Sequence, residues 1–458
     1  MKRTLLSLMV GLGVTVGATT SAFADDLLQV YQQALANDPV VNRAKAQKDA
    51  AFSGIKISRA SLLPQISGSI GYSTSSSENA QFLGEGIVTI DSDRDTSSYG
   101  LDLSMSLYDH ANWVGLDRAE KVAEQSDANL AAAMQELIVR VTTAYFDVLR
   151  AKDSLEFVKA QKSAIERQLE QTKQRFEVGL TAITDVHEAQ ANFDSTVAQE
   201  IQAENAVELA LEALRVISGK YHDRLYVLNT ENFSATMPQP ATPEAWLETA
   251  EEKNLALLVN RLAMDIAKED IQAARAGHYP TLDLVGSAGR SKTKSTTTAG
   301  DTVIDNTTPF LDNYSAGITL TVPIFQGLRV TGQTEQAKHN YISASQDLEL
   351  TYRQTVQSVR SSFNDVKASM STIRALEQAV VSAQSALEAT EAGFDVGTRT
   401  IVDVLNSTQN LFDARRNLAS ARYDFIQAVV NLKQAAGNLT AQDLEVINKG
   451  LRPAEMDS

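Results

Sequence analysis

Hydrophobic and polar residues follow two periods along this chain, one typical of long helices and one typical of strands. Between Leu116 and Val178, and again between Gln333 and Ala392, there is no glycine or proline, so each stretch can continue as a single helix. At a rise of 1.5 Å per residue, about 60 helical residues extend over about 90 Å. The pattern therefore predicts two helices several times longer than a small domain.

Late in both runs the apolar residues become spaced three and four residues apart, which is typical of coiled-coil packing. The first run has this spacing at Leu155, Val158, Ile165, Leu169, Thr172 and Phe176, with Lys162 the single interruption, and the second has it at Ile373, Leu376, Val380, Ala383, Leu387, Thr390 and Phe394. Gly179 and Gly397 then end the helices, because glycine accepts the left-handed conformation after a helix. Glycine-free runs resume, so we predict two antiparallel helical hairpins.

Four segments change from the helical period to strict alternation of apolar and polar residues. Their apolar faces are Ile66 to Tyr72, Tyr99 to Leu107, Leu282 to Ala288 and Ala316 to Ile324, each read at every second residue. Strands of about ten residues with one apolar and one polar face are typical of outer-membrane barrels. The connections at about 74–97 and 291–312 are rich in Ser, Thr, Asp and Gly, and we expect them to be long external loops. A soluble sheet with one face in water is the alternative.

The N-terminus indicates export. Lys2 and Arg3 precede an apolar run from Leu5 to Val16, and Ala22-Phe23-Ala24 has the small-residue pattern of a cleavage site. This is the arrangement of a secretory signal peptide. An N-terminal membrane anchor is the alternative, but the run is too short for one. No later stretch is long and apolar enough for a transmembrane helix, so any membrane crossing must use strands.

The remainder of the chain is an internal duplication. Phe176-Glu177-Val178-Gly179 recurs 218 residues later as Phe394-Asp395-Val396-Gly397, and Leu63-Pro64 matches Tyr279-Pro280 upstream. Each copy is expected to consist of a helix, two strands, a very long helix, a turn and a long helix.

The duplication divides the chain into predicted parts. A signal peptide at 1–24 precedes a first repeat at 25–237, which has strands at about 62–108 and a hairpin at about 111–219. A Pro-rich linker at 238–243 leads to a second repeat at 244–440, which has strands at about 280–325 and a hairpin at about 327–437, and a C-terminal tail follows at 441–458.

Composition excludes several functions. Lys and Arg number 41 against 57 Asp and Glu, a net charge of −16, which argues against nucleic-acid binding. Cysteine is absent, which excludes disulfides, thiolate metal sites and a thiol nucleophile. The five histidines form no metal-ligand pattern, and no phosphate-binding loop or serine nucleophile motif is present. We therefore expect the protein to bind no cofactor and no metal, and not to be an enzyme.

Strand counting predicts an oligomer. In lipid every backbone N–H and C=O group needs a partner, so a sheet must close into a barrel. Four strands per chain are too few, since the smallest barrels have about eight, and an eight-stranded barrel is filled by side chains. Three or four chains would leave an aqueous lumen. Together with the long helices, this favours a conduit across a periplasm; a surface-anchored structural or adhesive coiled-coil protein without transport is the main alternative, and an exported hydrolase is a distant third.

Three stretches resemble the TolC family of outer-membrane efflux proteins, and the resemblance covers essentially the whole mature chain. They are Ala392 to Leu405, which is similar to the family's periplasmic-entrance motif, Gly277 to Leu284, and Gln357 to Asn364. The resemblance implies an α+β membrane protein: a homotrimer with one twelve-stranded outer-membrane β-barrel, four strands per chain, continuous with a twelve-helix periplasmic α-barrel of coiled-coil hairpins. It also implies a periplasmic adaptor and an inner-membrane efflux pump or ABC exporter as partners, in drug efflux and type I protein secretion.

The resemblance also implies a site at the periplasmic entrance. Positions that match the family's gate are Gln168, Thr184, Asp185, Phe394 and Arg399, and positions that match its acidic ring are Asp403 and Asn406. Phe394 stands where the family has a tyrosine, so it has no hydroxyl to donate. Asn406 stands where the family has an aspartate, so a trimer would present three carboxylates in place of six.

Some of this site follows from the residues themselves. Asp403 and Asn406 are three residues apart just after a turn, so they share a helix face. Symmetry would gather their copies at a constriction, where carboxylates attract cations. Arg399 lies in the turn, from which it could reach Asp185 of the other hairpin. The alternative for Asp403 is an acid at a helix N-terminus, favoured by the helix dipole.

Overall fold

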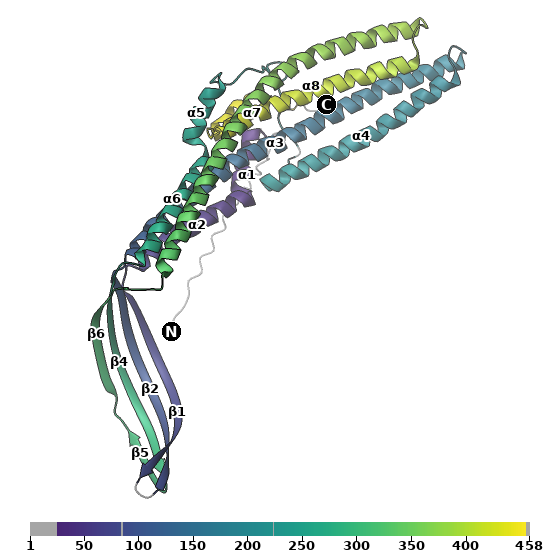
Figure 1. Ribbon diagram of the computed structural model, residues 1–458. Helices are drawn as coiled ribbons and strands as arrows, with labels where there is room; N and C mark the ends of the chain where they lie inside the picture. The colour runs from purple at the N-terminus through teal and green to yellow at the C-terminus, as the bar shows by residue number, and fades with distance from the viewer. Residues whose placement is uncertain (1–24, 84–85, 223, 455–458) are drawn as a thin grey trace, which may run out of the picture.

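The computed structural model describes residues 25–83, 86–222 and 224–454 of the chain. The molecule is elongated, with an antiparallel sheet at one end and two long helical hairpins at the other (Figure 1). The predicted signal peptide at 1–24 lies outside the described residues.

The sheet is built from both halves of the chain. Its strands are β1 (Gln65–Leu83), β2 (Gly86–Tyr108), β4 (Thr281–Ala299), β5 (Thr302–Thr307) and β6 (Leu311–Thr321). β1 pairs with β2, β2 with β4, and both β5 and β6 pair with β4, all antiparallel. β1 therefore forms one edge of the sheet, and β5 with β6 forms the other.

The predicted long loops at 74–97 and 291–312 are wrong. β1 and β2 pair without interruption from Gln65↔Ser104 to Leu83↔Gly86, and β4 continues to Ala299. Alternation fades in these segments because Ser, Thr and Asp occupy both faces, whereas backbone pairing needs no apolar side chain. β1 and β2 are consequently 19 and 23 residues long, about twice the expected length.

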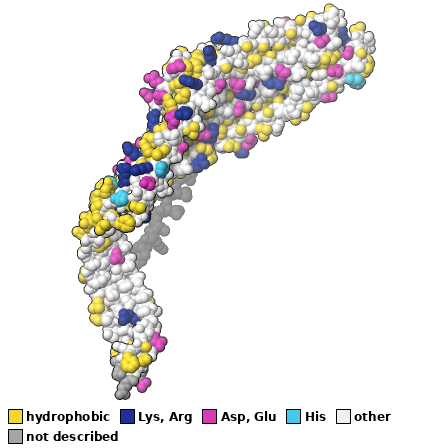
Figure 2. All heavy atoms as spheres, viewed as in Figure 1, with side chains coloured by type: hydrophobic (Ala, Val, Ile, Leu, Met, Phe, Trp, Pro, Cys, Tyr) yellow, Lys and Arg dark blue, Asp and Glu magenta, His cyan; other side chains and the backbone are white. Residues whose placement is uncertain are grey.

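The two faces of the sheet differ. On one face apolar side chains are exposed in the single chain, with Ile70 85% and Ile318 64% exposed. Figure 2 shows few hydrophobic or charged side chains over much of the visible side of the sheet, with hydrophobic ones gathered where it meets the helices. The alternation predicted for the strand portions nearest the helices is therefore present.

Each repeat begins with two helices, where the sequence predicted one. The pairs are α1 (Leu27–Asn37) with α2 (Pro39–Ala60), and α5 (Pro243–Lys253) with α6 (Leu255–Ala276). Asp38 separates the first pair by accepting a hydrogen bond from the Val41 amide at 2.8 Å, and Asn254 separates the second by accepting one from Leu257 at 3.1 Å. Both are N-cap contacts, which start a new helix.

The hairpins pair α3 (His110–Glu177) with α4 (Ile183–Ser218) and α7 (Arg329–Asp395) with α8 (Ile401–Ala435). α3 has 68 residues and α7 has 67, and both begin before the predicted runs, passing through a glycine. They end where predicted, with Gly179 and Gly397 at φ +77° and +80°. Coiled-coil packing within them stays a prediction. In the described ranges, none of the helices has the length and apolar character that crossing a bilayer requires.

The main core lies between the sheet and the hairpin tips. Helices from both repeats bury Tyr145, Trp246 and Leu432 there. The predicted C-terminal tail takes part in this region, because α9 (Ala441–Asn448) buries Leu444 and β7 (Leu451–Arg452) pairs with β3 (Val227–Leu228). Apart from the additional strands β3 and β5, the order of helices and strands before this tail occurs twice; the domain boundaries stay a prediction.

Candidate functional site

The predicted site residues lie near the tips of the two hairpins, at the end of the molecule far from the sheet (Figure 1). The α3–α4 turn spans 178–182 and the α7–α8 turn spans 396–400. A second apolar cluster joins the hairpins below these turns, and its buried members are Ile165, Leu169, Ala189, Leu387, Phe394, Ile401, Val404, Leu405 and Leu411. The tips are therefore packed against each other within one chain.

Phe394 is the predicted gate residue with the most extensive contacts. Its side chain is only 7% exposed, and the Arg175 guanidinium of the other hairpin lies 4.6 Å from the centroid of its ring. Arg175 also lies 3.7 Å from the Asp395 carboxylate. A cation over an aromatic face is attracted by the negative π-face of the ring. The aromatic ring here interacts through its face, so it contributes to the contact without a hydroxyl.

Arg175 was missed by the sequence reasoning. A signal was available, because Arg175 and Phe394 each lie in the last helical turn before a turn glycine, Gly179 and Gly397. Two hairpins that end at the same height bring such positions together. The duplication predicts the shared height, but it does not predict which side chains meet.

Arg399 and Asp185 each make contacts within the turn of their own hairpin. The Arg399 amide donates to the Gly393 carbonyl at 3.2 Å, and its stem lies so close that a Cβ at Gly393 would come within 2.7 Å of Arg399 Cγ. The Asp185 carboxylate accepts a hydrogen bond from the Thr181 hydroxyl. Within the described parts of one chain, no ion pair joins Arg399 to Asp185. Their bridge stays a prediction.

Thr184 and Gln168 complete the predicted gate. Thr184 is exposed at the start of α4. Gln168 is half-buried in α3, and its Oε1 atom is enclosed without a hydrogen-bond partner among the described residues. An enclosed, unpaired amide oxygen is costly, so Gln168 is a polar position that the packing of one chain leaves unsatisfied; its role in a gate stays a prediction.

Asp403 is part of a capping box at the start of α8. The Thr400 amide and hydroxyl both donate to Asp403 Oδ2 at 3.0 Å, and the Asp403 amide donates to Thr400 Oγ1 at 3.3 Å. Hydrogen bonds from the Thr400 backbone and side chain, together with the nearby Arg399 charge, lower the pKa of the Asp403 carboxyl. Asp403 therefore serves as the helix N-terminal acid, the alternative given above, and stays ionised at neutral pH. Asn406 is exposed on the same helix; the ring that they would form stays a prediction.

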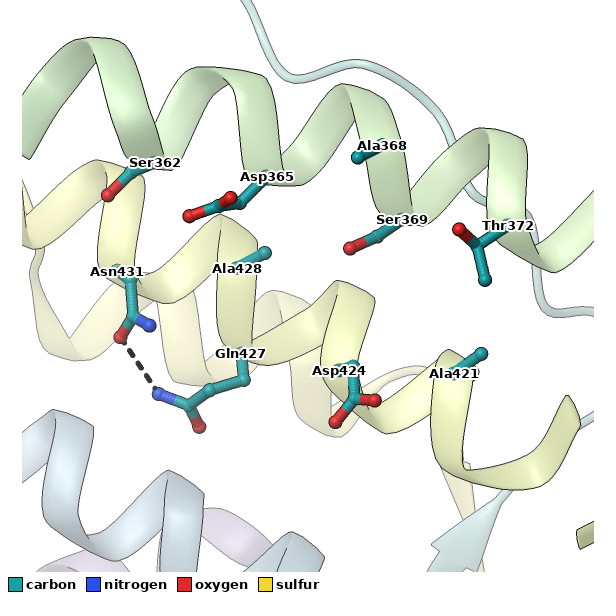
Figure 3. Close-up of a pocket in the computed structure, with 10 residues that line it drawn as sticks. All are labelled: Ser362, Asp365, Ala368, Ser369, Thr372, Ala421, Asp424, Gln427, Ala428 and Asn431. Atoms are coloured by element: carbon teal, nitrogen blue, oxygen red, sulfur yellow. Dashed lines mark hydrogen bonds between the residues drawn. The ribbon is translucent and has the colours of Figure 1, made fainter. Parts of the chain in front are cut away.

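A polar hollow lies on the helices away from the tips. Small and polar residues of α7 and α8 face a hollow of about 440 Å³. In Figure 3, Asp365 and Ser369 point toward this hollow from α7, and Gln427 donates to Asn431 on α8 at 3.0 Å. No group of three or more potential metal-ligating side chains occurs in 25–83, 86–222 and 224–454.

Comparison with known proteins matches almost the whole chain. The sequence model of the family described as "Outer membrane efflux protein" matches residues 30–220 and 246–438. The outer membrane protein TolC of Vibrio cholerae is 47% identical, covering 96% of this chain and 97% of that protein. TolC of Escherichia coli is 44% identical, covering 98% and 89%. The alkaline protease secretion protein AprF of Pseudomonas aeruginosa is 33% identical, covering 93% and 87%.

The fold is also shared with a solved channel. The crystal structure of the CmeC outer membrane channel of Campylobacter jejuni superposes with a TM-score of 0.73 at 18% identity, covering 93% of this chain and 90% of that one. At this identity the likeness concerns the fold, which is mostly helical with one sheet.

Proposed function

The chain belongs to the outer membrane efflux protein family, and from this premise we propose how its parts form a continuous exit duct. It is an outer-membrane channel of a Gram-negative bacterium that serves efflux and type I secretion, and it is not an enzyme. What the proposal adds is the assembly, the gate and the partners.

The proposal for the assembly rests on the two edge strands of the sheet, which have no further partner strand within the described chain. β1 lies at one edge and β6 at the other, and they run antiparallel because three antiparallel pairings separate them. β6 of one copy can therefore pair with β1 of the next in the same antiparallel pattern, which gives a closed ring of identical contacts. In lipid an unpaired edge is not tolerated. Three copies would give twelve strands around an aqueous lumen, with the apolar face in contact with outer-membrane lipid.

The same symmetry would assemble the helices. Each chain has four hairpin helices, so three copies supply twelve, and α3 alone extends over about 100 Å at 1.5 Å per residue. Arranged around the barrel axis, they would form a second tube through the periplasm. The hairpin tips then form its far end. There Phe394, Arg399, Thr184, Asp185 and Gln168 would hold the entrance closed.

The inner end of this duct requires partners. The chain contains no nucleotide-binding motif in its sequence, so energy for transport must come from elsewhere. We propose a periplasmic adaptor protein and an inner-membrane efflux pump or ABC exporter. The name of AprF, "Alkaline protease secretion protein", supports the export of protein through such a duct.

Conductance and particle shape test the duct. Purified protein in planar bilayers is expected to form a steady, cation-preferring pore, and electron microscopy of detergent-solubilised particles is expected to show threefold symmetry with a long hollow stem. The alternative, an anchoring protein without transport, would be supported if the bilayers carried no channel current even after the tip contacts are weakened, and if the particles were solid or monomeric.

The acidic ring gives a separate prediction. Asp403→Asn is expected to weaken block of the pore by divalent or trivalent cations, because it removes one carboxylate per chain from the entrance. Asn406→Asp is expected to strengthen the block. Thr400→Ala is the matched control, since it removes capping hydrogen bonds of Asp403 and keeps the carboxylate. Single-channel current measured against cation concentration reports the block. If neither substitution changes it, the ring is ruled out.

A further inference from the structure

The sheet has a polar face opposite the apolar one, and this polar face is nearly free of charge. Residues paired directly across neighbouring strands lie on the same face, and alternate residues along each strand continue it. Followed in this way from Ser67 on β1, the polar face consists mainly of Ser, Thr and Gly. Its only charged residues on the described strands are Arg94, Asp102 and Asp283. The charge of this face is therefore set by three side chains.

The two carboxylates lie in the part of the sheet whose other face is apolar. Both Asp102 and Asp283 are near the strand ends that join the helices. Arg94 lies toward the opposite end of β2, about 27 Å from Asp102 at 3.4 Å per residue. The end of the polar face nearest the helices is therefore acidic. The neighbours of the two aspartates along their strands belong to the apolar face, and they are Leu101, Leu103, Leu282 and Leu284.

Neither carboxylate is neutralised by the chain's own residues. In the described ranges, neither Asp102 nor Asp283 takes part in an ion pair. The apolar face differs, since Arg290 and Asp312 pair there at 2.6 Å. The Asp102 side chain is exposed and that of Asp283 is half-buried, so ions in solution can approach both. The cross-strand neighbours of the two aspartates are uncharged, and they are Ser67, Ser287, Ser106 and Thr319.

The lumen of a barrel built from three copies is narrow enough for these charges to act across it. Strands about 4.8 Å apart and tilted by about 40° give twelve strands a backbone radius of about 12 Å. Salt screens charges over about 10 Å at 0.1 M, which is close to that radius. The lipid behind the strands has a low dielectric constant and focuses the field into the water. Six carboxylates therefore act on every ion that crosses the lumen at this level.

We propose that Asp102 and Asp283 form a charge filter inside the barrel, which favours the passage of cations over anions. Rings of acidic side chains select cations in channels. The inference rests on the proposed barrel, because it requires the polar face to line the lumen. It goes beyond the duct by placing a selective element within the outer membrane, whereas Asp403 lies at the far end of helices about 100 Å long.

The reversal potential of the pore in planar bilayers under a KCl gradient tests this filter. Between about 10 and 100 mM salt, where charges act over about 30 to 10 Å, the double variant Asp102→Asn, Asp283→Asn is expected to lower the ratio of K⁺ to Cl⁻ permeability about twofold. Each single variant is expected to have part of this effect. Asparagine has nearly the shape of aspartate, so the assembly is retained. The same comparison in chains that also carry Asp403→Asn removes the contribution of the tip carboxylates.

Two controls on the same strand make the test specific. Asp95→Asn makes the same chemical change on the opposite face of β2, and it is expected to leave the permeability ratio unchanged. Arg94→Gln removes the cation of the polar face, and it is expected to raise the ratio. At about 1 M salt, where charges act over only about 3 Å, the double variant and the unchanged protein are expected to have the same ratio.

Three results would overturn the proposal: an equal ratio for the double variant and the unchanged protein at low salt, an equal decrease with Asp95→Asn, or a decrease that persists at about 1 M salt. In each of these cases the protein still conducts, so the duct itself stands. An unchanged protein that carries no channel current would contradict the proposed function, and this inference with it.

Discussion

Replacing Arg140 with alanine is expected to lower the free energy of unfolding by about 3 kcal/mol at neutral pH, the cost typical of breaking a buried ion pair. The Asp38 side chain is 1% exposed, and Arg140 Nη1 and Nη2 donate to its two carboxylate oxygens at 2.9 and 3.0 Å. Without Arg140 a buried charge is left uncompensated between α1 and α2. Guanidinium unfolding in detergent, followed by circular dichroism of the helices, measures the change.

The pH dependence of this effect has a definite sign. Burial alone would raise the pKa of the Asp38 carboxyl, but hydrogen bonds from Arg140 and the Val41 amide outweigh it and hold the pKa below its ordinary value. A lowered pKa in the folded state contributes stability above the unfolded pKa, about 4 for Asp, and this contribution is lost as pH falls through the folded pKa. The deficit of Arg140→Ala is therefore expected to shrink in acid.

Two further variants make this test specific. Adding Asp38→Asn to Arg140→Ala is expected to restore part of the lost stability at neutral pH, because asparagine keeps the N-cap and removes the stranded charge. Arg353→Ala breaks the exposed pair with Glu349 and is expected to change stability by less than about 0.5 kcal/mol. A double variant less stable than Arg140→Ala alone would contradict the account.

The long hairpin helices could be predicted closely, the helices before the sheet and the sheet itself only in part. Absence of glycine and proline specifies a long helix directly, and Gly179 and Gly397 fix where it ends because they adopt positive φ. Alternation, in contrast, reports only where a strand separates an apolar from a polar environment. At 74–79 and 91–97 both faces are polar, so the pattern disappears while the backbone pairing persists. The strand lengths therefore could not be read from hydrophobicity.

The site could be located from the sequence, but its contacts could not. The duplicated turn motif places Phe394 and Asp403 at a hairpin tip, where the structure also has them. The partner of Phe394 lies more than 200 residues away at Arg175, and pairings across separate hairpins leave no local pattern. Asp403 was open to two interpretations because a capping acid and a ring carboxylate have the same sequence signal. Only the contacts with Thr400 assign the first role.

Phe394→Ala is expected to raise the resting conductance of the pore several-fold, the largest effect of any single change at the tips. Truncation of a buried phenylalanine costs about 3 kcal/mol or more, and here it also removes the face over which Arg175 lies. Arg175→Gln keeps the ring and removes the cation–π attraction, about 1 kcal/mol, together with the ion pair to Asp395, and is expected to raise conductance less. Arg399→Ser, which loosens the stem packed on Gly393, is expected to act in the same direction.

The duplication supplies a matched control for this experiment. Phe176 occupies the position equivalent to Phe394 one repeat earlier, but it is 41% exposed where Phe394 is 7% exposed. Phe176→Ala removes the same atoms from the same turn motif without opening the apolar cluster between the hairpins, so it is expected to leave resting conductance nearly unchanged. Equal conductance of the two variants would mean that the tips are not held by the Phe394 cluster, and closure would then have to depend on contacts between copies of the chain.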